Sequence, residues 1–274
     1  MTDQPFMHDL PDERPLPPTG QADPRVAVVT GAALRIGRAI ALDLARQGWR
    51  VAITYNSSAD AAAATLRGIE ATGVRGAAIR ADLADEAQVE AVIPQAAAAL
   101  GPVSLLVNNA SAFRPDTVAT MTRASWDEHI EANLRAPLVL IQAMARQLPA
   151  GWPGNVINML DQRVWNPTPY FLSYTVAKMG LWTLTRTLAQ ALAPKIRVNG
   201  IGPGPTLKSD RQTEDQFARQ WDAVPLRRAT TPQEICDAIR FILSAPSMTG
   251  QMVALDGGEH MGWAQPTRGV TPME

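Results

Sequence analysis

Residues 26–37, VAVVTGAALRIG, decide the fold of this 274-residue chain. Four apolar residues with strand character lead into a turn of small residues, and the Ile/Ala/Leu spacing of a helix begins at Ile36. A strand, a glycine-bearing turn and a helix N-terminus together offer free backbone N–H groups and the positive end of the helix dipole to an anion. Gly31 permits the tight turn, and Gly37 permits a close contact between helix and strand. The stretch therefore predicts a βα unit that holds a nucleotide.

Short apolar or β-branched runs followed by turns recur along the rest of the chain. They predict seven strands, at Val26–Thr30, Arg50–Tyr55, Ala77–Arg80, Ser104–Asn108, Asn155–Met159, Ile196–Gly200 and Gln251–Leu255. Ala/Leu-rich segments with helical spacing predict helices at Ile36–Gln47, Ala59–Thr72, Glu86–Leu100, Ser125–Leu148, Ser173–Leu192 and Pro232–Leu243. Near-continuous apolar strands that alternate with helices are typical of a parallel sheet covered on both faces. We therefore expect an α/β protein, a single-domain, doubly wound Rossmann fold with a seven-stranded parallel sheet.

The two ends of the chain differ from this body. Six of the 22 prolines lie within residues 1–24, among acidic and amide residues, so we expect a disordered N-terminal tail there. Residues 25–262 are expected to form one dinucleotide-binding domain, and residues 263–274 a C-terminal tail. Within the domain, the polar and weakly patterned stretch Pro205–Thr231 predicts a substrate loop near 205–231, because a loop of that length is typically a lid or binding segment.

The composition excludes several classes of function. The 25 basic residues balance 26 acidic ones and form no block, so we expect no nucleic-acid partner. No apolar stretch reaches the ~18 residues of a spanning helix, and the N-terminus is acidic, so we expect no membrane association and a cytoplasmic location. Cys236 is the only cysteine and the three histidines are far apart, so no metal site is expected.

The end of the second predicted strand bears on the choice of dinucleotide. An NAD site usually offers a carboxylate to the adenosine ribose, but residues 55–58 read YNSS. Polar groups without negative charge leave room for a 2′-phosphate, so NADP (NADPH) is preferred, although no arginine stands at this point. After the third strand, Asp82 and Leu83 could bind the adenine amino group. Asp82 could instead cap the following helix, a role for which Asp85 is the better candidate.

A second group of residues carries the expected chemistry. Tyr174 and Lys178 lie four apart on a predicted helix, so they share one face, and an ammonium beside a phenol favours its ionised form. Asn109 follows the fourth strand, Asn133 lies inside the next helix and Asp161 follows the fifth strand. The carboxyl ends of the strands are where a doubly wound sheet binds ligands. Asn133, a polar residue on a buried helix, either ties strand to helix or holds a water that relays protons to Lys178.

The order of these motifs resembles the short-chain dehydrogenase/reductase family. The motifs are Thr-Gly-x5-Gly at 30–37, Asp-Leu at 82–83, Asn-Asn-Ala at 108–110, Asn133, Tyr-x-x-x-Lys at 174–178, VNGIGPG at 198–204 and LDGG at 255–258. They cover about residues 25–262, which the resemblance makes a catalytic domain. It implies an NAD(P)-dependent oxidoreductase in which Tyr174 is the acid, Lys178 binds the nicotinamide ribose and tunes Tyr174, and Asn133 supports a proton relay. It also implies a homotetramer.

Asp161 departs from that family, which usually has a serine thirteen residues before the tyrosine. An ionised carboxylate only accepts hydrogen bonds and would repel a developing alkoxide, so a simple ketone suits this site poorly. A substrate with N–H donors, or a ring nitrogen that awaits a proton, suits it better. The other interpretation of Asp161 is loss of function, with the side chain merely capping a turn.

Three features resemble pteridine reductases, which use NADPH to reduce dihydropterins and in some members folates. They are Arg35 in the glycine-bearing turn, Asp161, and the stretch Asn109–Pro115. The resemblance implies that Phe113 stacks on one face of the pterin and the nicotinamide on the other, while Ser111 and Arg35 reach its polar edge near the cofactor phosphates. Phe113 could equally be ordinary loop packing, and the Arg35 side chain could point to solvent.

The expected reaction is NADPH-dependent hydride transfer to a ring C=N of a dihydropterin or related pteridine or folate, with protons from Tyr174 and, through water, from Asp161. The expected catalytic residues are Tyr174, Lys178, Asp161 and Asn133. The expected cofactor-binding residues are Gly31, Arg35, Ile36, Gly37, Tyr55, Asn56, Ser57, Ser58, Asp82, Leu83, Asn109, Ala110, Ser111, Tyr174, Lys178, Pro203, Gly204 and Thr206. The expected substrate-binding residues are Arg35, Ser111, Phe113, Asp161 and Tyr174.

Two alternative functions remain open from the sequence. One is a carbonyl reductase or alcohol dehydrogenase of the same family that acts on another small substrate. The other is a sensor that binds NADP(H) without chemistry, although intact Tyr174, Lys178 and Asn133 argue against it. His129 and His260 show no acid/base partner at a meaningful spacing, so neither is expected to act in the site.

Overall fold

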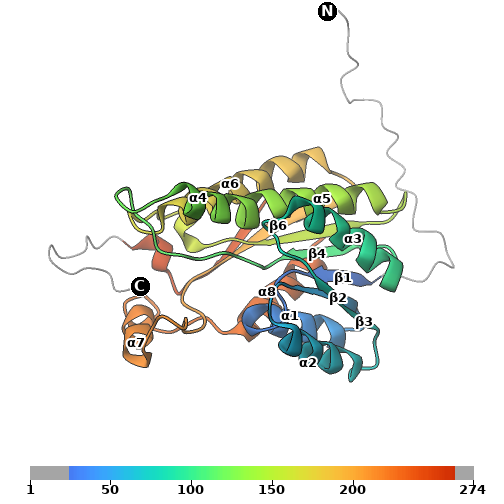
Figure 1. Ribbon diagram of the computed structural model, residues 1–274, viewed down its shortest axis with the longest axis horizontal. Helices are drawn as coiled ribbons and strands as arrows, with labels where there is room; N and C mark the ends of the chain where they lie inside the picture. The colour runs from blue at the N-terminus through green and yellow to red at the C-terminus, as the bar shows by residue number, and fades with distance from the viewer. Residues whose placement is uncertain (1–24, 263–274) are drawn as a thin grey trace, which may run out of the picture.

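Seven strands form one parallel sheet in the order β3-β2-β1-β4-β5-β6-β7, which confirms the predicted architecture (Figure 1). The computed structural model describes residues 25–262, so the tails predicted at 1–24 and 263–274 lie outside the described residues. The strands are β1 (Val26–Val29), β2 (Arg50–Tyr55), β3 (Gly76–Arg80), β4 (Leu105–Asn108), β5 (Gly154–Met159), β6 (Ile196–Pro203) and β7 (Met252–Leu255). Six of the predicted strands agree with these bounds to within one residue, and β6 continues three residues further than predicted.

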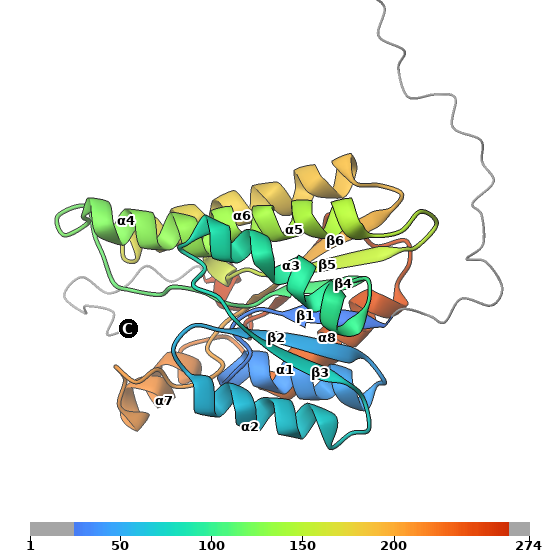
Figure 2. The ribbon, with the colours of Figure 1, turned by 45° about the vertical axis from the view of Figure 1, so that its right-hand side comes forward.

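Helices cover both faces of the sheet (Figures 1 and 2). One face carries α3 (Glu86–Leu100), α4 (Arg123–Ile130), α5 (Ala136–Gln147) and α6 (Leu172–Ala191), and the other carries α1 (Arg35–Arg46), α2 (Ala59–Glu70) and α8 (Pro232–Ser244). Strand side chains alternate between faces, so β1 contributes Val26 and Val28 to one apolar core and Ala27 and Val29 to the other. Within residues 25–262, no helix combines the length and apolar character needed to cross a membrane.

The strand order places a crevice at the carboxyl end of β1. β1 pairs with β2 on one side and with β4 on the other, so the chain crosses the sheet in opposite directions from this point. The turns after β1, β4 and β5 begin at Thr30, Asn109 and Leu160, next to the predicted site residues Gly31 and Asp161. The topology therefore brings the ligand-binding candidates of separate segments to one edge of the sheet.

The helix expected over Ser125–Leu148 is present from Arg123 to Gln147, but it is not α-helical throughout. A π-helical turn at Glu131–Arg135 separates α4 from α5, with Asn133 at its centre. A π turn inserts an extra residue into a helix and re-aims the side chains around it, and such turns are frequent at functional sites. The apolar periodicity of the sequence does not reveal it, because helical spacing resumes on both sides.

The substrate loop predicted near 205–231 also contains a helix, α7 (Glu214–Asp222). Thr213 caps its N-terminus by accepting a hydrogen bond from the backbone N–H of Gln216, and the Gln216 side chain bonds back to the Thr213 N–H. No residue of α7 is fully buried. The helices were predicted from apolar residues at helical spacing. α7 is too short and too exposed to show that pattern, so the sequence did not reveal it.

Gly37→Ala tests the close packing of α1 on the first turn. A Cβ at Gly37 would lie 2.5 Å from Nδ2 of Asn109 and 2.6 Å from the Gly31 carbonyl oxygen, and the backbone atom cannot move aside cheaply. We expect the free energy of unfolding in urea to fall by about 1–3 kcal/mol. The matched control is Gly68→Ala in α2, where a Cβ meets only the flexible end of Leu42, and we expect it to be neutral or stabilising. Equal effects of the two substitutions would contradict this account.

Candidate active site

The turn after β1 forms a cradle that a phosphate can enter. α1 begins at Arg35; its N-cap Leu34 makes no side-chain hydrogen bond and the first turn holds no acidic residue, so the N-terminal N–H groups keep their positive field. Gly31 has φ +61°, and a Cβ there would lie 2.9 Å from Ala110. The tight turn predicted at Gly31 and the close contact predicted at Gly37 are both present.

The cradle is built on a fixed junction between β1 and β4. Thr30 Oγ1 accepts hydrogen bonds from the backbone N–H groups of Asn109 and Ala110, at 2.9 and 3.0 Å. Asn109 Nδ2 donates in return to the Thr30 carbonyl at 2.8 Å. Thr54 Oγ1 accepts from the Gly31 N–H at 3.0 Å, which joins β2 to the same turn. The shape of the turn is therefore set by the protein before any ligand binds.

The end of β2 carries no acid, but a cation that the sequence analysis missed lies beside it. Arg80 is the last residue of β3 and pairs in register with Tyr55. Its Nε donates to the Asn56 carbonyl at 3.3 Å, and its side chain is exposed. Arg80 comes from β3 and not from β2, so it could be found only from the register in which the two strands pair.

The two aspartates before α3 differ in role. Asp85 caps α3 by accepting from the Gln88 N–H at 3.2 Å, which confirms the capping prediction. Asp82 Oδ1 accepts from the Ala84 N–H at 3.0 Å, and both Asp82 and Leu83 remain half-buried beside the end of β3. Their predicted role toward adenine stays a prediction.

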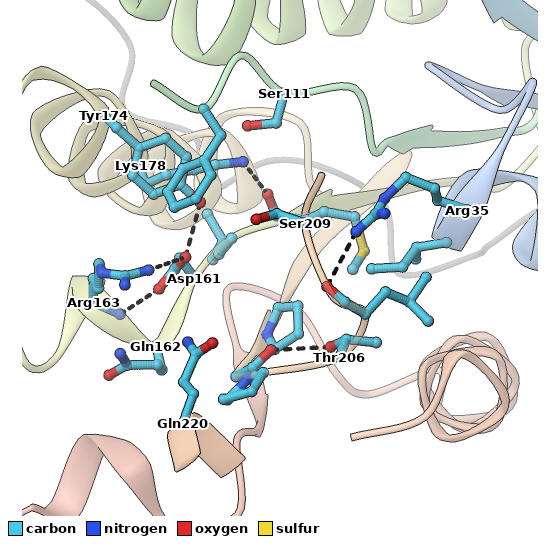
Figure 3. Close-up of a pocket in the computed structure, with 18 of the residues that line it drawn as sticks. Arg35, Ser111, Asp161, Gln162, Arg163, Tyr174, Lys178, Thr206, Ser209 and Gln220 are labelled. Carbon is cyan, nitrogen blue, oxygen red and sulfur yellow. Dashed lines mark hydrogen bonds and ion pairs between the residues drawn. The ribbon is translucent and has the colours of Figure 1, made fainter. Parts of the chain in front are cut away.

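Asp161 and Tyr174 meet in the crevice (Figure 3). The Tyr174 hydroxyl donates to Asp161 Oδ2 at 2.8 Å. The same carboxylate accepts from the Arg163 backbone N–H at 2.8 Å and from Arg163 Nη1 at 3.2 Å. Asp161 therefore does cap the turn Gln162–Val164, as one interpretation held, but it also bonds to the tyrosine.

Arg163 is a site residue that the sequence analysis missed. The side chains of Asp161 and Arg163 are 13% and 8% exposed, so their charges are poorly screened by water. The guanidinium offsets the negative charge of the carboxylate, and with it much of the repulsion that Asp161 alone would exert on a developing anion. The sequence did hold a signal for this residue, the Asp-x-Arg spacing directly after β5. Because Asp161 caps the turn that follows, that spacing brings the two side chains into contact.

Lys178 lies one helical turn after Tyr174 in α6 and is fully enclosed. Its Nζ donates to the Met159 carbonyl at 2.7 Å and lies 5.7 Å from the centroid of the Tyr174 ring. Burial lowers the pKa of Lys178 to about 8, against the opposing effect of the Asp161 carboxylate. The predicted neighbourhood of Tyr174 and Lys178 is thus present, and the amine titrates close to neutral pH.

An aromatic wall stands beside this pair. The Phe113 ring meets the Tyr174 ring edge to face, with centroids 4.7 Å apart, and stacks on Phe171 with centroids 4.5 Å apart and an interplanar angle of 4°. The Arg163 guanidinium lies 5.8 Å from the centroid of Phe113 and 5.4 Å from that of Phe171. Because Phe171 covers one face of Phe113, a flat ligand could stack only on the other, and the Arg211 guanidinium also lies over this ring, 5.4 Å from its centroid. Phe113 lines the cavity, so it does more than pack a loop.

Arg35 bridges the cradle to the segment predicted as a substrate loop. It begins α1 with φ +54°, and its guanidinium donates to the carbonyls of Leu207 and Lys208 at 3.1 and 2.9 Å. The side chain is therefore not directed uselessly into solvent. Both partners are neutral carbonyls, so the full positive charge of Arg35 stays beside the N-terminus of α1.

Asn133 holds the segment that carries Phe113. Its Oδ1 accepts from the Ala112 N–H and its Nδ2 donates to the Ala112 carbonyl, both at 2.8 Å. Of the two roles considered for Asn133, these contacts describe the structural tie. The water-relay role stays a prediction.

The expectation that the histidines lack partners is wrong. His129 is buried and contacts Ser173 Oγ at 2.6 Å through Nδ1 and the Arg114 N–H at 3.1 Å through Nε2. His260 contacts Asp256 Oδ2 at 2.6 Å through Nδ1. Ser173 is 44 residues from His129 along the chain, so no local spacing could reveal that pair. Asp256 precedes His260 by four residues, a spacing that the sequence analysis overlooked.

A cavity of about 260 Å³ gathers many of the predicted site residues. It is lined by Arg35, Ile36, Asn109, Ser111, Phe113, Asp161, Tyr174, Lys178, Pro203, Gly204 and Thr206. The other predicted residues do not line the cavity. They lie in or near the turn after β1, at the ends of β2, β3 and β4, and in the π turn: Gly31, Gly37, Tyr55, Asn56, Ser57, Ser58, Asp82, Leu83, Ala110 and Asn133. Further lining residues were not named individually: Gln162 and Arg163 follow β5, whereas Arg211, Phe217 and Gln220 come from the stretch predicted as a substrate loop near 205–231. Over residues 25–262, no three His, Cys, Asp or Glu side chains gather as a metal site requires.

Comparison with known proteins gives matches over most of the chain. A family model described as Enoyl-(Acyl carrier protein) reductase matches residues 31–260. The 3-oxoacyl-[acyl-carrier-protein] reductase FabG of Staphylococcus epidermidis is 33% identical over 240 residues, which cover 86% of this chain and 98% of that protein. The structure of FolM Alternative dihydrofolate reductase 1 from Brucella canis, complexed with NADP, is 44% identical with a TM-score of 0.83 and covers 89% of this chain and 98% of its own. The Brucella suis counterpart, also with NADP, is 47% identical with a TM-score of 0.85, and the coverages are 88% and 96%.

The buried Lys178 predicts a pH dependence of stability. Its pKa is lowered from 10.5 to about 8 in the folded protein, so the unfolded chain binds more protons between these values. The cost of the buried charge is fully present below pH 8 and is relieved as the pH rises toward 10.5. Compared with Lys178→Met, the wild-type free energy of unfolding should therefore rise between pH 8 and 10, by at most about 1.4 kcal/mol per pH unit. Parallel curves for the two proteins in urea titrations would show that Lys178 is not shifted.

Proposed function

The chain belongs to the short-chain dehydrogenase/reductase family, and from that membership and the geometry of its site we propose that it uses NADPH to reduce a ring C=N bond of a dihydropterin or a related pteridine or folate. The reduction adds a hydride to the carbon and a proton to the adjacent nitrogen, while NADPH is oxidised. NADPH, when bound, supplies the hydride. The protein supplies the slot, the proton and the charge balance.

The observation that carries the proposal is the Tyr174–Asp161–Arg163 arrangement beside Phe113. A ketone oxygen needs hydrogen-bond donors around it, but Asp161 offers an acceptor. Pteridine rings present amide and amino N–H groups, from which a carboxylate can accept hydrogen bonds. Because the charge of Asp161 is offset by Arg163, the site can take up a neutral ring without a net negative field. The face of Phe113 that Phe171 does not cover offers that ring an aromatic surface for offset stacking, with the Arg211 guanidinium nearby.

NADPH fits the residues on the cofactor side. The uncapped N-terminus of α1, the glycine turn and the Arg35 guanidinium suit a diphosphate. Tyr55 and the three polar residues after it provide no carboxylate to oppose a 2′-phosphate, and Arg80 places a positive charge beside them. The NADP complexes of the two FolM structures support the same choice.

Each central residue has a role that its contacts support. Tyr174 holds the proton for the ring nitrogen, and Asp161 orients the Tyr174 hydroxyl and accepts N–H groups of the substrate. Lys178, held by the Met159 carbonyl, is placed to bind the nicotinamide ribose and to favour proton loss from Tyr174. Asn133 positions the wall through Ala112. The homotetramer implied by the family resemblance stays a prediction.

A second candidate function is reduction of a carbonyl substrate. The FabG relatives are named for 3-oxoacyl reduction, and 33% identity over 240 residues supports related chemistry. Asp161 separates the two candidates, because a carbonyl enzyme gains by having a hydroxyl donor at that position. The sensor alternative has no support in the contacts of Tyr174 and Lys178, which form a connected polar group in the cavity.

Turnover of a dihydropterin tests the proposed function directly. We expect NADPH absorbance to fall on addition of dihydrobiopterin or dihydrofolate, and Tyr174→Phe to slow this at least about 100-fold, as expected for loss of an acid catalyst, with NADPH affinity nearly unchanged. Asp161→Ser should lower pteridine turnover and should not create a ketone reductase. Because Asp161→Ser leaves the Arg163 charge buried without this partner, Asp161→Ser/Arg163→Leu serves as the folded control, checked by its melting temperature.

The outcomes divide the candidates. Turnover of ketones but of no pteridine, with a further rise in Asp161→Ser, would assign the protein to carbonyl chemistry. Absence of turnover with every substrate, in a folded protein that binds NADPH, would support the sensor.

Arg80→Gln tests the choice of NADPH. Loss of a charge near the 2′-phosphate should raise KM for NADPH about tenfold, the scale of one charge-assisted hydrogen bond, and leave KM for NADH unchanged. Arg75→Gln is the matched control, because Arg75 lies just before β3, at the other end of that strand, and donates to the Ala99 carbonyl. An equal change in KM for NADPH and NADH would remove Arg80 from cofactor selection.

A further inference from the structure

The segment that carries Phe113 has no regular secondary structure. Residues 109–122 connect β4 to α4 without a helix or a strand, so no backbone ladder sets their position. Ordering a free segment of this kind when a ligand binds costs roughly 1–2 kcal/mol per residue. A wall that is ready for a flat ligand therefore needs other contacts to hold it.

Two side chains from neighbouring helical turns make such contacts. Asn133 bonds to both backbone groups of Ala112 at 2.8 Å, and His129 Nε2 accepts from the Arg114 N–H at 3.1 Å. Residues four apart in a helix are about 6 Å apart along its axis, and alternate residues of an extended chain are about 6.5 Å apart. His129 and Asn133 therefore match the spacing of positions 114 and 112.

The same spacing fixes the direction of Phe113. Consecutive backbone groups of an extended chain point to opposite sides. Ala112 and Arg114 face the helices, whereas the Phe113 carbonyl accepts from Arg211 Nη1 at 2.9 Å, from the segment after β6. The Phe113 ring meets Tyr174 edge to face. A slip of one residue would exchange the two sides and turn the ring away from the cavity.

The hydrogen-bond partners determine which nitrogen of His129 carries the proton. A backbone N–H can only donate, so Nε2 accepts and the proton of neutral His129 is on Nδ1, from which it is donated to Ser173 Oγ. The Ser173 hydroxyl in turn donates to Asp116 Oδ2, and Asp116 Oδ1 accepts from the Ser173 N–H at 3.2 Å. Since the hydroxyl proton faces the carboxylate and all three side chains are buried, this group is not a nucleophilic triad. It joins the loop to the first turn of α6, next to Tyr174.

The surroundings favour the neutral form of His129. Burial lowers the pKa of His129, and Arg114 acts in the same direction, while Asp116 on the loop and Glu128 on α4 oppose them. From α6 it meets the Ser173 hydroxyl and the Tyr174 ring, whose centroid is 6.0 Å away. If Nε2 were protonated, its N–H would face the Arg114 N–H, and neither group could accept a hydrogen bond. The bond between His129 and Arg114 would then be lost.

We propose that His129 is a positioning residue for the pteridine substrate: together with Asn133 it clamps the loop at residues 112 and 114 and so directs the Phe113 ring toward the cavity. The inference rests on the proposed function, in which Phe113 stacks on the ring. His129 does not line the cavity, and it meets Tyr174 only ring to ring, with centroids 6.0 Å apart. We therefore expect its loss to act through the wall and to leave the cofactor side intact.

Two substitutions at position 129 separate the two bonds of the histidine. Gln places an amide oxygen near the position of Nε2 and can keep the bond to Arg114, whereas Asn reaches only as far as Nδ1. We expect His129→Asn to raise KM for dihydrobiopterin about tenfold, the equivalent of one hydrogen bond, with kcat and the Kd for NADPH nearly unchanged. His129→Gln should stay close to wild type. Glu128→Gln, which removes the exposed ion pair to Arg114 and leaves both hydrogen bonds of His129 in place, is the matched control and should have little effect.

Hydrogen exchange gives a readout that does not depend on turnover. The Arg114 amide should be protected in the wild type and His129→Gln and exposed in His129→Asn, as followed by mass spectrometry or NMR of the full chain. If the wild type reduces no pteridine, the proposed function fails. The exchange pattern then still shows whether His129 holds the loop at Arg114. Equal protection in all variants, or a parallel loss of NADPH binding in His129→Asn, would overturn the inference.

Discussion

A buried carboxylate that must be bonded on every side is the constraint on which the rest of the site depends. Asp161 is nearly enclosed, and removing an ionised carboxylate from water is costly unless donors surround it. Tyr174 and Arg163 provide three such donors. The phenolic proton is thereby directed at a defined atom, and the guanidinium charge is held next to the carboxylate. The result is a partly enclosed site that offers an acceptor without a net negative charge.

Arg163 links this charge balance to the shape of the slot. The guanidinium that bonds to Asp161 also lies within 6 Å of both stacked rings, Phe113 and Phe171. A cation near aromatic rings is attracted by their π-electrons, most strongly where water is excluded. The position of the aromatic wall and the charge balance of the Asp161 carboxylate therefore depend on one side chain. Altering either the carboxylate or the wall is expected to disturb the other.

Local patterns were sufficient to predict the sheet, the glycine turn and the Tyr174–Lys178 pair. Each of these is encoded within a few residues, as strand hydrophobicity, a turn or a helical spacing of four. Arg80 and His129 act through partners that come from other segments, across a strand pair or 44 residues away. Arg163 is close to Asp161 in sequence, but only the fold places its guanidinium beside the aromatic rings. What was missed therefore depends on strand register and tertiary contact, which a single sequence does not display.

The two halves of the crevice are stabilised in different ways, and this difference bears on how the family varies its substrates. The cofactor half is fixed by backbone geometry: a glycine turn, a helix N-terminus, and bonds between Thr30 and Asn109. The half that carries Phe113 is an irregular segment positioned by side chains from surrounding helices. Side chains change by single substitutions without disturbing the sheet, whereas backbone geometry does not. A chain can therefore keep its dinucleotide site while the segment that holds Phe113 changes. This chain is similar over most of its length to proteins with names as different as 3-oxoacyl reductase and alternative dihydrofolate reductase, which agrees with such a division.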